Sequence, residues 1–205
     1  FTVTITDNQN PSITCPSNIN VNTDANLCTA VVNYTAPVGT DNCPGATTVQ
    51  TAGQASGTNF PVGLTTNTFK VTDASGNTAT CSFTVTVNDT EAPKIVCPNN
   101  IVMNNDAGVC GAVVSYASPV GTDNCSGAST VRIAGLGSGS TFPIGTTTVT
   151  HRVTDAAGLT ASCSFTVTVT GLAPEVHCPS DITVNNTPGV CGASVTFAAT
   201  ETRGI

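Results

Sequence analysis

The sequence predicts an all-β chain of tandem β-sandwiches, with about 82 residues in each repeat. Two observations point to this fold class first: the chain matches itself at a fixed offset, and short alternating segments separated by turn residues recur along it. The third observation is composition. Thr and Val are abundant and fit a pleated strand better than a helix, while charged residues make up 8% of the chain and Trp is absent. We therefore expect almost no helix.

The spacing of the cysteines shows the internal repeat most clearly. An offset of 82 residues places the four cysteines of one copy on those of the next without a gap: Cys15, Cys28, Cys43 and Cys81 on Cys97, Cys110, Cys125 and Cys163. A third copy repeats only the first two, as Cys178 and Cys191. We expect a window from a longer array in four segments: the last strand of a preceding repeat at 1–7, repeat 1 at 11–89, repeat 2 at 93–170 and an incomplete repeat 3 at 173–205.

Each repeat contains about seven strand candidates. In repeat 1 they span residues 13–15, 19–22, 30–34, 47–51, 58–60, 67–72 and 78–87. The last is the clearest, because every second residue of 81–87 is apolar and one face can therefore pack inward. The turn at 73–77 joins it to the preceding strand as a hairpin. Short strands with these turn signals are typical of an immunoglobulin-like sandwich with Greek-key connections.

Ten cysteines indicate a secreted chain of small domains held by disulfides, because a reducing cytosol would keep the thiols free. Four cysteines in a repeat allow three connectivities, and spacing alone does not choose among them. The first strand of such a sandwich commonly runs beside the last. We therefore expect the bonds Cys15–Cys81 and Cys97–Cys163, with local pairs Cys28–Cys43 and Cys110–Cys125, and with Cys178 and Cys191 left without an assigned partner.

Several function classes find no support in the sequence. The net charge of −7 and the shortage of Lys and Arg leave no basic stripe for nucleic acid, and no apolar run approaches the ~20 residues of a membrane-spanning helix. No Gly-x-Ser-x-Gly elbow is present, and no His recurs at an equivalent position, so neither a Ser-His nucleophile nor a zinc site is indicated. His151 and His177 are expected to be ordinary surface or strand residues. We expect no catalytic residues and no enzyme.

A set of motifs runs through the chain: Pro-x-Ile-x-Cys-Pro-x-x-Ile, Cys-Gly-Ala-Val-Val-x-Tyr, Asp-Asn-Cys, Phe-Pro-x-Gly, Thr-Asp-Ala-x-Gly and Cys-Ser-Phe-Thr-Val-Thr-Val. As a set they resemble the hyalin repeat (HYR) of bacterial surface proteins, and the resemblance covers essentially the whole chain. It implies an immunoglobulin-like fold, a role in adhesion or extracellular architecture, and no catalytic residues. The third copy departs from the pattern after Phe197.

Acidic residues that recur near the junctions between repeats have two interpretations. One is a calcium site that draws on Asp7, Asp73, Asp89 and Glu91, since calcium takes six to eight oxygen ligands. The other, which we favour, is turn capping, in which each Asp accepts hydrogen bonds from its own backbone. Gly171 replaces the acid at the second junction, which weakens the case for calcium. Apart from calcium, no cofactor is expected.

The function expected from the sequence is a structural or adhesive extracellular array at the cell surface, whose repeats act as spacers or form a filament. Its partners would be neighbouring copies of the chain, other surface proteins or glycans. The alternatives are a lectin-like module that binds glycans or proteins, and a non-catalytic region of a larger secreted enzyme. A glycan site usually presents exposed aromatic side chains, and the chain offers only Tyr34 and Tyr116. Four sequons mark candidate glycosylation sites at Asn33, Asn88, Asn124 and Asn185.

Overall fold

The computed structural model describes residues 1–171, 175–177, 180–196 and 200–202. All the regular elements in these residues are β-strands, so the described part of the chain offers no helix that could cross a membrane. The chain divides into two compact units. One comprises residues 1–94 with 121–129 and 153–161, and the other comprises 95–120, 130–152 and 162–205. The predicted all-β fold class is confirmed.

Repeat 1 forms two sheets. Its strands are β1 (Ile19–Asn22), β2 (Thr29–Val32), β3 (Thr47–Ala52), β4 (Thr58–Pro61), β5 (Gly63–Thr72) and β6 (Thr78–Asn88). The larger sheet has the order β1-β6-β5-β3, and β2 pairs with β4 in the smaller one. The first strand does run beside the last: β1 is parallel to β6, with Ile19 opposite Val85.

Residues 13–15 do not form the strand expected for them. Ser12 makes an isolated bridge to Thr40, and the next residues carry no ladder. The flanking prolines, Pro11 and Pro16, explain the difference because neither has the N–H group that a ladder requires. The segment is instead tied to the sandwich by the side chain of Cys15.

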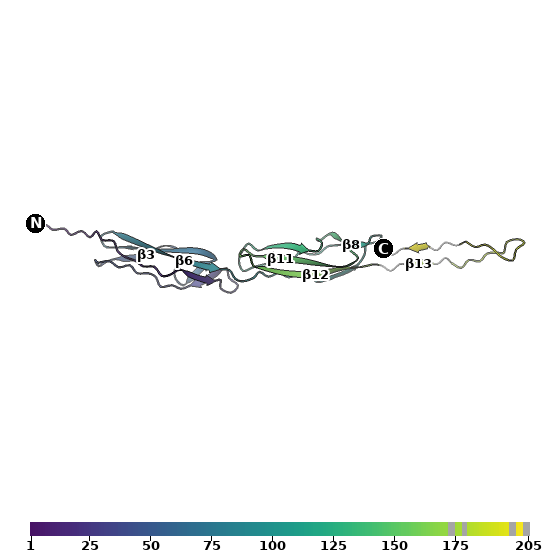
Figure 1. Ribbon diagram of the computed structural model, residues 1–205, viewed down its shortest axis with the longest axis horizontal. Helices are drawn as coiled ribbons and strands as arrows, with labels where there is room; N and C mark the ends of the chain where they lie inside the picture. The colour runs from purple at the N-terminus through teal and green to yellow at the C-terminus, as the bar shows by residue number, and fades with distance from the viewer. Residues whose placement is uncertain (172–174, 178–179, 197–199, 203–205) are drawn as a thin grey trace. The chain divides into compact units, whose positions relative to one another are not determined.

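Repeat 2 rebuilds the same architecture. Its strands are β7 (Ile101–Asn104), β8 (Gly111–Val114), β9 (Ser129–Ala134), β10 (Ser140–Pro143), β11 (Gly145–Thr154) and β12 (Thr160–Thr170). The sheet orders are β7-β12-β11-β9 and β10-β8, and the long strands β11 and β12 lie side by side (Figure 1). The two repeats therefore share one topology strand for strand.

The third copy is described only in part. Strand β13 (Glu175–His177) pairs antiparallel with β14 (Thr200–Thr202). Between them, residues 180–196 include a turn in which the Thr187 amide donates to the Gly192 carbonyl at 2.9 Å. Cys178 lies outside the described residues, and the incomplete third repeat at 173–205 stays a prediction.

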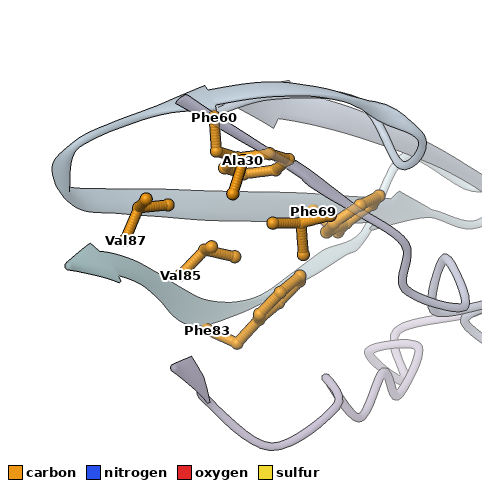
Figure 2. Close-up of a cluster of buried hydrophobic side chains, with 7 residues drawn as sticks. Ala30, Phe60, Phe69, Phe83, Val85 and Val87 are labelled. Carbon is orange, nitrogen blue, oxygen red and sulfur yellow. The ribbon is translucent and has the colours of Figure 1, made fainter. Parts of the chain in front are cut away.

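The core of each repeat lies between its two sheets. In repeat 1, Ala30 and Phe60 of the smaller sheet meet Phe69, Phe83 and Val85 of the larger one (Figure 2). The side chains alternate along β6 as the sequence predicted, with every second residue buried from Phe83 onward. Burying each such Val or Phe side chain contributes roughly 1.5–3 kcal/mol. The turn before β6 is also confirmed, since the Asp73 amide donates to the Asn77 carbonyl at 3.1 Å.

His151 is a strand residue, as expected, but it belongs to the core and not to the surface. Only 5% of it is exposed, on strand β11, at the position that Phe69 occupies in repeat 1. Its ring stacks on Phe165 with a centroid separation of 6.5 Å. Burial lowers the pKa of His151, and the positive charge of Arg132 lowers it further. A neutral imidazole therefore replaces a phenyl ring in this core.

Candidate functional site

Two disulfides close the sandwiches within the repeats. Cys15 bonds to Cys81 and Cys97 bonds to Cys163, each with a Cα–Cα distance of 5.6 Å. These are the pairs expected from the sequence. The parallel pairing of the first strand with the last is the cause, because it draws the segment before the first strand against the start of the last.

The third disulfide corrects the expected local pairs. Cys28 bonds to Cys125, with a Cα–Cα distance of 4.8 Å, so the expected pairs Cys28–Cys43 and Cys110–Cys125 are wrong in the structure. Among the described cysteines, Cys43, Cys110 and Cys191 are free. The bond therefore joins a residue of repeat 1 to a residue of repeat 2.

The length of strand β5 explains why Cys28 cannot reach Cys43. The Cys28 carbonyl accepts from the Val62 amide, at the residue before β5 begins. Cys43 precedes β3, whose first residue, Thr47, lies opposite the last residue of β5. Ten residues of β5 separate the two ends, which is about 30 Å at the usual rise per residue. A disulfide requires Cα atoms closer than about 7 Å.

The turn that carries Cys28 is held by its own backbone and by one carboxylate. Asp24 anchors it: its amide donates to the Thr29 carbonyl at 2.8 Å, and its Oδ2 accepts from the Val31 amide at 2.9 Å. Asn26 adopts a φ of 59°, in the left-handed region that Asn tolerates better than most residues. Cys28 is the last residue of this turn and directly precedes strand β2.

The loop that carries Cys125 is held by the motif Asp-Asn-Cys. Asp123 accepts from the Cys125 amide at 2.9 Å through Oδ2. The Asn124 side-chain amide donates to the Leu27 carbonyl at 2.9 Å and to Asp89 Oδ1 at 3.4 Å. The disulfide is therefore flanked by a direct hydrogen bond between its two loops, and both lie in the same compact unit.

The segment that follows β6 lies against the same turn. Glu91 accepts from the Asn26 amide at 2.8 Å and pairs with Lys94 at 3.0 Å. The hydrogen bond from the Asn26 amide, followed by the one from Lys94, lowers the pKa of Glu91. Because Lys94 is 71% exposed, solvent screens the ion pair and it contributes little to stability.

The four acids considered for calcium divide into two groups. Asp73 acts as a turn cap and accepts from Ser75, Asn77 and Asn77 Nδ2 at 2.8 to 2.9 Å. Burial alone would raise the pKa of Asp73, but these hydrogen bonds outweigh it and the pKa is lowered. Glu91 is engaged by Lys94 as described. Asp7 and Asp89 differ, because each lies beside a second carboxylate.

These carboxylate pairs are equivalent in the two repeats. Asp89 lies with Asp123 and Cys125, and Asp7 lies with Asp41 and Cys43, in each case with ligand atoms within 4.8 Å of one another. Cys125 is in a disulfide and offers no thiolate. Three side-chain oxygens of this loop and of Asp89 are buried and lack a hydrogen-bond partner: Asp89 Oδ2, Asp123 Oδ1 and Asn124 Oδ1. An all-oxygen set of this kind suits a hard cation.

The sequon asparagines have unequal environments. Asn33, Asn88 and Asn185 are exposed. The Asn124 side chain is half-buried, and its amide nitrogen is committed to Leu27 and Asp89. Attachment of a sugar to that nitrogen would leave it a single N–H for the two acceptors that it contacts.

Both tyrosines point into the sandwich and not into a binding surface. The Tyr34 ring lies 5.0 Å from Phe83 and its hydroxyl donates to the Gln54 carbonyl at 2.6 Å. Tyr116 packs on Phe165 in the same way, at 4.9 Å. The aromatic side chains that a glycan site would need are thus used in the cores.

Sequence reasoning missed Asp123 as the neighbour of Asp89, and it missed Leu27 and Asn124 as the contact that accompanies the disulfide. The repeated Asp-Asn-Cys motif was the available signal. The Asp and the Cys of this motif each recur at an offset of 82. Because partners were sought only among the cysteines of the same repeat, the pairing of Cys28 with a cysteine of the next repeat was not considered.

Comparison with models of known protein families shows the family of this chain. The HYR domain matches residues 6–87 and 88–169, which together cover most of the chain. The chain belongs to the HYR domain family. These two matches divide the chain close to where the sequence repeat does, and Cys28 and Cys125 fall in different HYR domains.

The relatives of this HYR chain include two sea-urchin proteins named Hyalin. The chain is 41% identical to the one from Strongylocentrotus purpuratus over 88% of its own length and 15% of the relative's. It is 36% identical to the one from Lytechinus variegatus over 96% of its own length and 38% of the relative's. It thus spans well under half of either protein. Neither relative is bacterial, so the expected bacterial source has no support from them.

Among solved structures, the chain is similar to the protocadherin γB4 extracellular domain. The TM-score is 0.39 and the sequence identity is 19%, over 97% of this chain and 39% of that one.

Proposed function

We propose that this HYR chain is a segment that transmits tension in an extracellular structural or adhesive array. The observation that carries the proposal is the set of three disulfides, two within repeats and one from repeat 1 to repeat 2. Disulfides persist in oxidising surroundings, which supports an extracellular location. The proposal assigns no catalytic step to these repeats, and its partners are other copies of the repeat or other surface proteins.

The bonds within the repeats limit how far the chain can extend under tension. Each spans a sequence separation of 66 residues, so tension applied to the ends passes through the S–S bond and bypasses the segment between the cysteines. A fully extended chain gains at most about 3.5 Å per residue, which makes each bypassed segment worth roughly 230 Å of length. Unfolding of one sandwich would therefore lengthen the array very little.

Single-molecule force spectroscopy of the chain tests this proposal. In the oxidised protein, we expect no unfolding step as long as a whole repeat, and we expect reduction to add roughly 230 Å to the step of each repeat. Because the Cys28–Cys125 bond offers tension a second covalent path, the variants are made in a Cys28→Ser, Cys125→Ser background. There, Cys15→Ser with Cys81→Ser should release the long step in repeat 1 alone, and Cys97→Ser with Cys163→Ser in repeat 2 alone. Long steps in the oxidised wild-type chain would contradict the proposal.

The lectin-like alternative receives less support, because Tyr34 and Tyr116 are committed to the cores. A glycan array screened with the oxidised chain tests that alternative. Saturable binding that is lost when Ser or Thr residues of an exposed loop are replaced would support it.

A second candidate function, binding of a divalent cation, is favoured by the unpartnered oxygens around Asp89 and Asp123. Asp89 and Asp123 are half-buried, each with one buried carboxylate oxygen, and a cation between them would offset the repulsion of two neighbouring negative charges. We propose that Asp89, Asp123 and the Asn124 carbonyl oxygen would hold calcium, with water completing the shell.

Calcium binding is tested by thermal unfolding with calcium and with a chelator. Calcium at a hundred times its dissociation constant would stabilise the folded chain by about 2.7 kcal/mol. The variant Asp123→Asn should remove the shift, while Asp24→Asn, which alters an acid outside this cluster, should leave it. A melting temperature that is the same in calcium and chelator would rule the site out without bearing on the mechanical role.

A further inference from the structure

Two free cysteines have bonded counterparts elsewhere in the chain. Cys43 of repeat 1 is equivalent to Cys125, and Cys110 of repeat 2 is equivalent to Cys28, at the same offset of 82 residues. Both are free in the structure, whereas their counterparts bond to each other. Each repeat therefore has one cysteine in the inter-repeat disulfide and one equivalent cysteine that is unpaired.

The loop around Cys43 already has the form of the bonded loop. The Cys43 amide donates to Asp41 Oδ2 at 2.9 Å, as the Cys125 amide donates to Asp123 Oδ2 at 2.9 Å. Asp7 lies beside this loop as Asp89 lies beside the other. Because the loop has this form without a disulfide, the bond does not create it, and Cys43 is preorganised for a partner.

The turn around Cys110 likewise has the form of the turn around Cys28. The Asp106 amide donates to the Gly111 carbonyl at 2.7 Å, and Asp106 Oδ2 accepts from the Val113 amide at 2.9 Å, matching the bonds of Asp24. Gly108 has a φ of 74° where Asn26 has 59°. Cys110 itself is exposed.

The same turn recurs a third time around Cys191. The Thr187 amide donates to the Gly192 carbonyl at 2.9 Å, and Gly189 has a φ of 83°. Three successive copies thus present a cysteine on one turn geometry, and the copy whose partner is present forms a disulfide.

From these equivalences we infer that Cys43 and Cys110 are unfilled halves of the same inter-repeat disulfide as Cys28–Cys125. Cys110 bonds to the loop cysteine, equivalent to Cys125, of the HYR repeat that follows in the array, and Cys43 bonds to the turn cysteine of the repeat that precedes. Every junction then has two covalent connections, the main chain and one disulfide. This inference rests on the geometry of the two loops and does not require the mechanical role proposed above.

Formation of each bond is a two-electron oxidation of two thiols. An oxidised dithiol oxidoreductase or oxidised glutathione accepts the electrons by thiol–disulfide exchange: two protein thiols and one donor disulfide give one protein disulfide and two donor thiols. The hydrogen bond to Asp7, burial, and the charges of Asp7, Asp41 and Asp73 raise the pKa of the Cys43 thiol. Each bond therefore needs two exchange steps: one cysteine thiolate attacks the donor disulfide and releases one donor thiol, and the other attacks the resulting mixed disulfide and releases the second.

Peptide mapping of the natural full-length protein, alkylated with N-ethylmaleimide and digested without reduction, tests the inference. Trypsin with Asp-N isolates Cys43 in residues 41–70 and Cys110 in residues 106–122. We expect 106–122 linked to a peptide that begins Asp-Asn-Cys or its equivalent from the next repeat, and 41–70 linked to a peptide holding a turn cysteine. In Cys110→Ser, that link should be lost and the loop cysteine of the next repeat should become alkylated.

Isotope mixing distinguishes a partner cysteine in a second copy of the chain from one in a neighbouring repeat of the same chain. Oxidised glutathione is added to a mixture of unlabelled and nitrogen-15-labelled copies of the chain. A mixed-isotope link between 106–122 and 41–70 would show that a second copy supplies the partner, with the same chemistry. Alkylation of both cysteines in the natural protein, or a bond from either to a cysteine outside these two loop types, would overturn the inference.

Discussion

The two HYR repeats are the same sandwich with different polar groups inside. Their strands, sheet orders and Tyr packing agree, yet Phe69 is replaced by His151 and Asn67 by Val149, and each of these four residues is buried. In the turn before the last strand, Asn77 is replaced by Leu159. The comparison teaches that backbone ladders, turns and the intra-repeat disulfide define the fold, while single core positions accept a ring or a short side chain of either polarity.

The polar exchanges leave different groups without partners in the two repeats. Asn67 Oδ1 accepts from the Gln54 amide at 2.8 Å, but its Nδ2 has no partner. In repeat 2 the exchanges leave His151 Nδ1, and Asp155 Oδ2 beside Leu159, without partners. Each buried group of this kind costs about 1–3 kcal/mol, so the two repeats should differ in stability and in how that stability depends on pH.

The largest effect should come from the disulfide that both repeats share. Replacing Cys15 and Cys81 with Ser should destabilise repeat 1 by roughly 4 kcal/mol, because the unfolded chain regains the entropy of a long loop. Hydrogen exchange of β6, measured by mass spectrometry against β12, should report the loss in repeat 1 alone. The matched pair Cys97→Ser with Cys163→Ser should reverse the pattern, and equal losses in both repeats from either pair would contradict this independence.

The next effect is a pH dependence confined to repeat 2. The folded pKa of His151 lies below its unfolded value of about 6.5, so the unfolded state binds more protons and stability falls as pH drops below that value, by up to about 1.4 kcal/mol per pH unit. His151→Phe should abolish this slope between pH 7 and 5 in hydrogen exchange of β12. Phe69→His should create it in repeat 1, and an unchanged slope in His151→Phe would contradict the assignment.

A smaller effect is expected in the turns before the last strands. Asn77 Nδ2 donates to Asp73 Oδ2 at 2.8 Å, and Leu159 cannot do this for Asp155. Leu159→Asn should therefore stabilise repeat 2 by about 1 kcal/mol, measured by urea denaturation. The reverse change, Asn77→Leu, should destabilise repeat 1 by at least as much because Asn77 also donates to the carbonyls of Asp7 and Gln9.

The smallest effect concerns the free thiol of repeat 1. Asp7 raises the pKa of Cys43, so Asp7→Asn should lower that pKa and speed alkylation of Cys43 by iodoacetamide near pH 8. Cys110 in the same sample provides the control. Unchanged alkylation of Cys43 would show that Asp7 does not govern its thiol.

Much of the fold could be read from the sequence because its signals are local. Alternation along residues 81–87 identified the last strand, and the turn residues at 73–77 identified the hairpin. The Cys15–Cys81 pairing needed only the common adjacency of the first and last strands. The strand proposed at 13–15 failed because two prolines flank it, a feature the sequence already displayed.

The third disulfide could not be read in the same way, because it depends on distances that only the folded strands define. Cys28 and Cys43 are close in sequence, but β5 separates them by its full length. The nearby sequence residues Leu27 and Asp41 do not indicate at which end of the sandwich Cys28 and Cys43 lie. The acidic pair of Asp89 and Asp123 was missed for the same reason, since the two residues come from different repeats.

A disulfide map of the oxidised chain tests most directly whether the Cys28–Cys125 bond joins the two repeats. Trypsin with Asp-N places Cys28 alone in residues 24–40 and Cys125 alone in residues 123–132. The structure predicts a linked species of these two fragments that reduction separates, together with alkylated Cys43 when no neighbouring repeat is available. A link between fragments 24–40 and 41–70 would instead establish the local Cys28–Cys43 pair and contradict the covalent connection between repeats.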